Sequence, residues 1–202
     1  MSLVSVVDAG IGNFMAVDNM LRRVGLDSNI VNDPNQLAAA THVILPGVGS
    51  FDGAMGRLND GNWTEALRLF VSEGKGTLVG ICLGAQLLGN TSEEGNLEGL
   101  GFIDFDVRRI QSKGLPLPHM GWNTVQAMAP AGPLAHLFDT AKYYFAHSYA
   151  IPVDPRFTQG ITTHGQQFSS VVKSGRIWGF QFHPEKSHSY GKRLLMDVFD
   201  VD

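Results

Sequence analysis

The chain has 202 residues, of which 44% are hydrophobic and 17% are charged. This length and apolar content suffice for one sizeable α/β domain with a buried core, and they exclude an intrinsically disordered chain. The formal net charge of -4 at pH 7 gives no reason to expect a nucleic acid or an anionic membrane as a partner.

The first ninety residues alternate between strand-like and helix-like patterns. Short apolar, β-branched runs predict buried strands at 3–7, 29–31, 42–45 and 76–79. Apolar residues at helical spacing predict helices over 14–24 and 63–72, and the Asp33-Pro34 pair predicts the start of a short helix that ends near residue 40. This alternation indicates an open, mostly parallel twisted sheet with helices on both faces.

Two glycine-rich segments follow predicted strands. Gly10-Ile11-Gly12 is close to a dinucleotide-binding fingerprint, but Met15 stands where that fingerprint needs a small residue. We therefore expect a βα turn here and no nucleotide cofactor. Residues 46–51 form a second glycine-rich loop at the end of a strand, and ligands of open α/β sheets bind at such ends.

The second half of the chain is different in character. Short strand-like runs at 105–107, 124–126, 143–145, 160–162 and 168–172 are separated by turn residues. They predict antiparallel strands added to one edge of the sheet. One more strand over 177–182 and a final helix from about residue 189 complete the expected fold, which we interpret as a single domain spanning 1–202.

The segment Gly80-Ile81-Cys82-Leu83-Gly84 follows the fourth predicted strand and precedes a helical pattern. A nucleophile flanked by glycines between a strand and a helix is typical of a nucleophile elbow. Such a turn holds the central residue in a strained conformation and points its side chain towards a ligand. The helix N-terminus favours a thiolate at Cys82, and the Leu83 N–H is placed to face an oxyanion.

A cysteine nucleophile needs a base, and the base needs a group that orients it. Of the seven histidines, His183 directly follows a predicted strand, at the same kind of sheet edge as Cys82. Glu185 lies two residues later, across a proline that fixes the local backbone. We therefore predict a Cys82–His183–Glu185 triad. The spacing of the Cys and His residues favours no metal site, and we expect no cofactor.

These motifs carry a resemblance. Residues 80–86 and 181–185 resemble the class I, triad-type glutamine amidotransferases. Residues 118–123, 145–149 and 186–187 are similar to those of the glutaminase subunits of imidazole glycerol phosphate synthase, and the similarity extends from the first strand to the last helix. That family hydrolyses L-glutamine and passes ammonia to a separate (β/α)₈-barrel cyclase subunit in histidine biosynthesis. The resemblance implies such a heterodimer here.

The resemblance also assigns roles to individual residues. It implies that Cys82, His183 and Glu185 form the triad, and that the backbone of Leu83 and Val48 forms the oxyanion hole. Glutamine would be bound by five further residues: Gly49, Gln86, Glu94, Ser148 and Tyr149. Because ammonia must leave without entering bulk water, we expect the partner to dock near Trp122, Lys186 and the loop after the first strand. Two departures are Ala9 and Ala85, where the family usually has tyrosine and methionine.

Three alternatives remain open. A related glutaminase subunit feeding another barrel synthase, such as one that makes an amidino sugar, would have the same triad. A cysteine hydrolase or peptidase of similar fold would share the elbow without needing Gln86 or Glu94. A non-catalytic scaffold subunit is disfavoured by the complete triad.

The single cysteine allows no internal disulfide and fits a reducing compartment. The first residues lack the basic start and apolar stretch of a signal peptide, and no apolar run approaches the roughly 18 residues of a membrane span. We therefore expect a cytoplasmic location.

Overall fold

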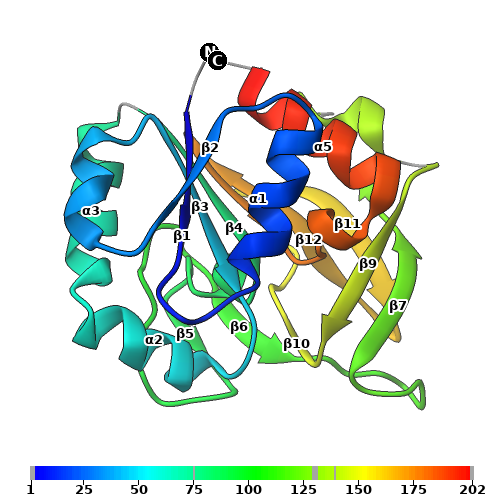
Figure 1. Ribbon diagram of the computed structural model, residues 1–202. Coiled ribbons are helices and arrows are strands. Elements are labelled where there is room, and N and C mark those ends of the chain that lie inside the picture. Colours follow the sequence, from blue (N-terminus) through cyan, green and yellow to red (C-terminus); the bar gives the residue numbers. More distant parts are fainter. Residues whose placement is uncertain (1–2, 75, 129–131, 139, 201–202) are drawn as a thin grey trace.

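The computed structural model describes residues 3–74, 76–128, 132–138 and 140–200. Its main sheet has the strand order β2-β1-β3-β4-β13-β12-β11-β8 (Figure 1). The first five strands of that order are parallel and the last three are antiparallel additions at one edge. Their bounds are β1 Val4–Val7, β2 Ser28–Val31, β3 His42–Gly47, β4 Thr77–Cys82, β13 Ile177–Phe180, β12 Gln166–Ser174, β11 Thr158–His164 and β8 Gln126–Ala127. The predicted mostly parallel sheet is confirmed.

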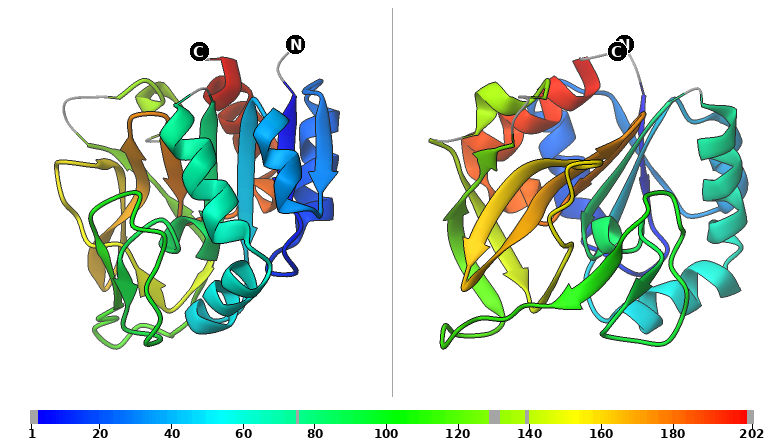
Figure 2. Two further views of the ribbon diagram at one scale, coloured as in Figure 1. Left: turned by 90° about the vertical axis from the view of Figure 1, so that its left-hand side faces the viewer. Right: turned by 180° about the vertical axis from the view of Figure 1, so that it is seen from behind.

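Helices cover both faces of this sheet (Figures 1 and 2). The apolar residues of α1 (Phe14–Arg23) and α5 (His188–Asp200) pack into one core cluster with Val4, Val6 and Ile44. The apolar residues of α2 (Phe51–Asp60) and α3 (Trp63–Glu73) pack into a second cluster on the other face. Successive strand residues point to opposite faces, so each inner strand supplies both clusters.

Several boundaries differ from the predictions. The segment after Asp33 is a 3₁₀ helix, η1 (Pro34–Ala39), and β3 continues through Gly47, which was expected in a loop. The helix α2 was not predicted at all. Its buried stripe of Phe51, Ala54, Met55 and Leu58 has helical spacing, but two glycines inside it weaken the helical signal.

The later strands do not all extend the main sheet, so that prediction is wrong in part. The strands β7 (His119–Thr124) and β9 (Lys142–His147) pair with each other in a separate two-stranded sheet, and β10 (Tyr149–Ala150), β6 (Asp106–Arg109) and β5 (Thr91–Ser92) form a third sheet. The chain bends at Ser148, where it passes from one small sheet to the other. The strand β9 ends, and β10 follows it, on the side of the molecule where the parallel strands have their carboxyl ends (Figure 1).

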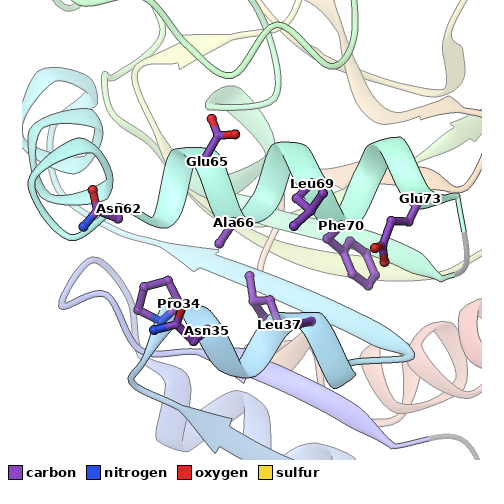
Figure 3. Close-up of a pocket in the computed structure, with 10 residues that line it drawn as sticks. Pro34, Asn35, Leu37, Asn62, Glu65, Ala66, Leu69, Phe70 and Glu73 are labelled. Atoms are coloured by element: carbon purple, nitrogen blue, oxygen red, sulfur yellow. The ribbon is translucent and has the colours of Figure 1, made fainter.

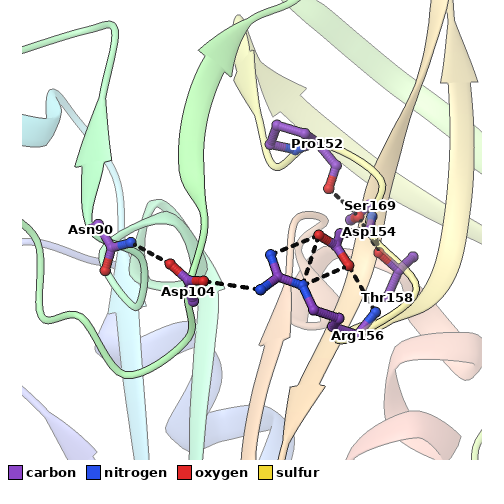
Figure 4. Close-up of polar contacts among 7 residues, drawn as sticks. All are labelled: Asn90, Asp104, Pro152, Asp154, Arg156, Thr158 and Ser169. Carbon is purple, nitrogen blue, oxygen red and sulfur yellow. Dashed lines mark hydrogen bonds and ion pairs between the residues drawn. The ribbon is translucent and has the colours of Figure 1, made fainter.

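An exposed ionic network ties the third sheet to the start of β11 (Figure 4). The Arg156 guanidinium lies 2.8 Å from an Asp154 oxygen and 3.1 Å from an Asp104 oxygen, and Asn90 donates to Asp104. Hydrogen bonds from the side chain and the backbone of Arg156 lower the pKa of the Asp154 carboxyl. Because these groups are exposed, we expect the network to contribute little to stability.

Two short 3₁₀ segments complete the fold: η2 (Ala135–Leu137) and η3 (Pro184–Lys186). Among the described residues, no helix combines the length and the apolar character that crossing a membrane requires.

Candidate active site

Cys82 ends β4 at the sharp turn that the sequence predicts. Its backbone has φ 54° and ψ -109°, a positive φ that is strained for any residue other than glycine. The turn is possible because Gly84 and Gly80 pack directly against neighbouring backbone, where a methyl group would collide. The helix that follows, α4 (Leu83–Gln86), is a single turn and therefore shorter than expected.

His183 and Glu185 follow β13, the strand that pairs with β4. The His183 Nδ1 atom lies 2.7 Å from Glu185 Oε1, and each side chain is only 3% exposed. Burial acts to lower the pKa of His183, but contacts with Cys82 and then Glu185 outweigh it and raise that pKa to about 9. Because Glu185 accepts at Nδ1, the remaining ring nitrogen of His183 is the one that faces Cys82.

These residues open into a cavity of about 220 Å³ at the carboxyl ends of β3 and β4. Ten residues predicted from the sequence line it: Val48, Gly49, Cys82, Leu83, Gln86, Glu94, Ser148, Tyr149, His183 and Lys186. Glu185 lies behind His183 and does not line it. The cavity thus gathers residues from across the chain around one sulfur atom.

The turn after β3 lies beside the elbow in a defined orientation. The Val48 N–H donates to the Ile11 carbonyl oxygen at 2.6 Å, so it is engaged with the loop after β1. Gly49 has a φ of +103°, and a methyl group there would meet no atom within 4 Å. In this arrangement the Val48 N–H is not available to a ligand.

Gln86 is held by its amide nitrogen, which donates to the Tyr149 carbonyl at 2.8 Å and to Gln181 Oε1 at 3.1 Å. Both amide hydrogens are thereby used, which leaves the carbonyl oxygen of Gln86 as its free polar atom in the cavity. Glu94 presents a carboxylate there, one oxygen of which accepts the Phe51 N–H at the start of α2 at 2.9 Å. The cavity therefore offers acceptors that suit a cationic or amide group.

The sequence did not single out several residues of the site. The Ala146 carbonyl lies 4.0 Å from the Cys82 sulfur, and His147 lines the cavity beside it. Ser187, which is fully buried, donates to the His183 carbonyl at 2.6 Å and accepts the Tyr144 N–H at 3.0 Å. Ala146 is far from Cys82 in the sequence, and Tyr144 is far from Ser187, so no local motif shows these contacts.

Lys186 lines the cavity, and Trp122 lies on the adjacent surface, where both contact the Tyr144 ring. The Trp122 side chain is 45% exposed, and its ring stacks on His188 at a centroid distance of 5.3 Å. The Lys186 ammonium lies 5.6 Å from the centre of the Tyr144 ring, which also meets Trp122 edge-on. Trp122 is therefore a surface residue and not part of the core.

A larger cavity of about 400 Å³ lies between η1 and α3 (Figure 3). Its walls include the apolar side chains of Leu37, Leu69 and Phe70, with Glu65 and Glu73 at the edge. It shares no residue with the cavity at Cys82 and contains no nucleophile or histidine. The residues capable of nucleophilic catalysis therefore belong to the smaller cavity.

Among the described residues, no three Cys, His, Asp or Glu side chains are grouped so as to hold a metal ion.

Comparison with known proteins agrees with this geometry. The family model for class-I glutamine amidotransferases matches residues 5–201. Solved structures with similar folds include a glutamine amidotransferase, with a TM-score of 0.77, 20% identity and coverage of 98% of this chain and 97% of the other. PurLQS from Thermotoga maritima gives a TM-score of 0.76 at 18% identity, covering 99% and 98%. At these identities the structures support the fold alone.

The curated relatives are closer in sequence. The imidazole glycerol phosphate synthase subunit HisH of Bdellovibrio bacteriovorus is 38% identical, over 98% of this chain and all of its own length. HisH of Escherichia coli K12 is 37% identical over 98% and 99%, and that of Synechococcus elongatus is 41% identical over 95% and 90%. The family model, which spans almost the whole chain, shows that the protein is a class-I glutamine amidotransferase. Within that class, the chain belongs to the HisH family of imidazole glycerol phosphate synthase subunits.

Proposed function

We propose that this chain hydrolyses L-glutamine to glutamate and ammonia, and delivers the ammonia to a cyclase subunit that makes imidazole glycerol phosphate and an aminoimidazole carboxamide ribotide in histidine biosynthesis. The observation that carries the proposal is the single cavity in which Cys82, His183 and the expected glutamine-binding residues meet. Family membership supports it over almost the whole chain.

In the proposed mechanism the Cys82 sulfur attacks the side-chain amide carbon of glutamine. His183 takes up the thiol proton and gives it to the departing nitrogen, so that ammonia leaves and a glutamyl thioester remains. Water, deprotonated by His183, then releases glutamate and restores the thiol. Glu185 keeps the imidazole in the required tautomer and stabilises its charged form, which fits the raised pKa of His183.

The substrate-binding residues follow from the same cavity. We assign the α-ammonium of glutamine to the Glu94 carboxylate and its polar groups to the Gln86 carbonyl oxygen and to the backbone of Gly49, Ser148 and Tyr149. The developing oxyanion would take hydrogen bonds from the Leu83 and Val48 N–H groups. For Val48 this requires the peptide to turn away from Ile11.

We further infer that the cyclase docks over the mouth of this cavity, against Trp122 and Lys186, so that ammonia passes directly between the subunits. The exposed tryptophan ring and the neighbouring ammonium suit an interface anchor. A cytoplasmic heterodimer, with residues 1–202 as one amidotransferase domain, follows from this assignment.

The substitution Cys82→Ala tests the proposal in the complex with the cyclase. We expect it to abolish glutamine-dependent synthesis and to spare synthesis driven by added ammonium salt, because the thiolate serves only amide hydrolysis. Equal loss of both reactions in an intact complex would contradict the division of labour. A wild-type complex that turned over no glutamine, or cleaved peptides instead, would refute the glutaminase itself.

A related subunit that feeds another barrel synthase, for example one making an amidino sugar, would have the same active site. The relatives named above are all HisH subunits, which favours the histidine pathway. Purification of the barrel partner from the source cell distinguishes the two.

A further inference from the structure

Two buried histidines, one in the wall of the cavity and one behind it, have no part in the mechanism above. His119 on β7 and His147 on β9 are directly paired across the strands, and are 5% and 6% exposed. The Nδ1 atom of His119 lies 3.1 Å from the Nε2 atom of His147. His147 lines the cavity, whereas His119 lies one layer deeper, stacked at 4.2 Å between ring centres on His164.

The hydrogen bonds fix where the protons of this pair are. The His147 Nδ1 atom lies 2.7 Å from the Tyr149 carbonyl oxygen, which can only accept, so Nδ1 carries the proton. In the neutral ring Nε2 is then an acceptor, and His119 must donate to it from its own Nδ1. The Nε2 atom of His119 in turn accepts from the Asn123 amide at 3.2 Å. Each histidine is therefore held in a single tautomer.

Burial keeps both rings neutral. It lowers the pKa of His119 to about 4, with a further contribution from the charge of His164. It also lowers the pKa of His147 to about 3, although the bond to Tyr149 acts in the opposite direction. All four ring nitrogens are engaged in hydrogen bonds, so none of them is left to bind a metal ion or to exchange a proton.

The Tyr149 carbonyl is where this pair meets the substrate cavity. It accepts one hydrogen bond from His147 and another from the Gln86 amide nitrogen at 2.8 Å. The His147–Tyr149 bond closes over the bend at Ser148, where the chain leaves β9 for β10. The carbonyl position therefore sets both the shape of this bend and the direction of the Gln86 amide.

We propose that His147, supported by His119, is a positioning residue of the glutamine site: its Nδ1–H holds the Tyr149 carbonyl, which aims the Gln86 carbonyl oxygen at the substrate. This inference rests on the proposed glutaminase function and adds to it two residues that touch no reacting atom. It assigns them to substrate binding and not to the chemical step.

A pair of substitutions at one position tests this directly. In His147→Asn the side-chain amide nitrogen takes a place close to Nδ1 and keeps the donation to Tyr149. In His147→Gln the amide lies near the position of Nε2 and that donation is lost. In the complex with the cyclase and its nucleotide substrate, we expect His147→Gln to raise the KM for glutamine about tenfold, with a smaller change in kcat, because a buried acceptor loses its donor. His147→Asn should stay within about threefold of wild type.

The same two substitutions at His119 give an independent test, since His119→Asn keeps the donor to His147 and His119→Gln removes it. These variants decide the matter if His147→Gln does not fold. His136→Gln is the matched control, because His136 is exposed and pairs with Asp197 away from the cavity. Ammonia-driven synthesis reports that each complex is intact.

The inference is overturned if the asparagine and glutamine variants behave alike at both positions, or if the loss falls on kcat with an unchanged KM. An inactive wild-type complex would refute the proposed function, and this inference with it. The proposed function and this inference are both supported if the complex is a glutaminase and only its His147→Gln and His119→Gln variants bind the substrate poorly.

Discussion

His183 is fixed through its backbone as well as its side chain. Its N–H donates to the Tyr144 carbonyl at 2.8 Å, and its own carbonyl accepts from Ser187 at 2.6 Å. Glu185 then sets the ring through Nδ1. These bonds leave the imidazole little freedom except to exchange a proton with Cys82, which is what a general base requires.

The substitution Glu185→Gln should lower the pKa of His183, because it removes one of the two contacts that raise it while burial remains. We expect the imidazole of the wild type to titrate near pH 9 and that of the variant at lower pH, as followed by NMR of the ring nuclei. An unchanged midpoint would mean that Glu185 does not stabilise the charged ring.

The sign of the linked effect on stability follows from the same shift. The folded pKa of His183 lies above the ordinary value of 6.5. The protonated ring therefore stabilises the fold fully below about pH 6.5, and that contribution is lost as the pH rises through 9.

For catalysis, Glu185→Gln should cost roughly a hundredfold less in kcat than His183→Ala, because Glu185 orients the base and does not transfer the proton. Equal losses in kcat would contradict this order.

Among the elements, the nucleophile elbow is packed tightly against the neighbouring strand β3. Gly84 lies against the Leu45 carbonyl of β3, and a methyl group on it would collide with that oxygen. Gly56 on α2 has no atom within 4 Å of such a methyl group and an ordinary helical backbone. Two chemically identical substitutions should therefore have opposite effects.

We expect Gly84→Ala to lower the free energy of unfolding by about 3 kcal/mol or more, since backbone must shift to admit the methyl group. Gly56→Ala should raise it by about 0.5–1 kcal/mol, because alanine loses less conformational entropy in a helix. Denaturant unfolding of both variants checks this. Two destabilised proteins of equal stability would show that the elbow is no tighter than the helix.

The same elements show how far the sequence could be interpreted. Cys82 and the pair His183 and Glu185 were predictable because each belongs to a local motif that follows a strand. The helix α2 was missed because Gly53 and Gly56 weaken its helical pattern. The roles of His147 and Ser187 were not predictable, since each also has a distant partner: His119 across β7 and β9 for His147, and the Tyr144 backbone for Ser187. The Cys82 motif consists of consecutive residues, whereas the residues that line its cavity come from segments far apart in the sequence.

For the whole molecule, the mouth of the cavity is the surface on which we propose that the cyclase docks. Trp122 and Met120 point outward from β7, with Met120 65% exposed, while His119 of the same strand faces inward. Lys186 lines the cavity and contacts Tyr144, whose backbone is bonded to His183. A protein docked here would touch residues that are one step from the triad.

We expect the double substitution Trp122→Ala, Lys186→Ala to weaken binding of the cyclase by roughly 30-fold, or about 2 kcal/mol, as for loss of an interface anchor. Titration calorimetry measures this. Leu69→Ala is the control, because Leu69 is 53% exposed on α3 and lies beside the other cavity. Unchanged affinity of the double variant would exclude this surface as the docking site.

Docking also offers a way to control the reaction, through the turn after β3. The Val48 N–H is bonded to Ile11 and so does not face Cys82. In the oxyanion hole proposed above, Leu83 is then the remaining donor, and the loss of one such donor costs about 100- to 1000-fold in rate. Rotation of the Gly47–Val48 peptide, which carries the Val48 N–H, would supply the missing donor. Gly47 and Gly49 flank Val48 and make that rotation inexpensive, because glycine tolerates positive and negative φ alike.

We therefore expect the isolated subunit to be a poor glutaminase that its partner activates. A cyclase whose substrate-bound form binds the rotated turn more tightly shifts the equilibrium towards it, by as much as that difference in affinity allows. Glutamine turnover should be lowest for the subunit alone and should rise by about 100- to 1000-fold with cyclase and its nucleotide substrate together. Cyclase without nucleotide separates the effect of docking from that of the ligand. Full activity in the isolated subunit would show that the Val48–Ile11 bond does not restrain catalysis, and that the glycine turn is only a wall of the cavity.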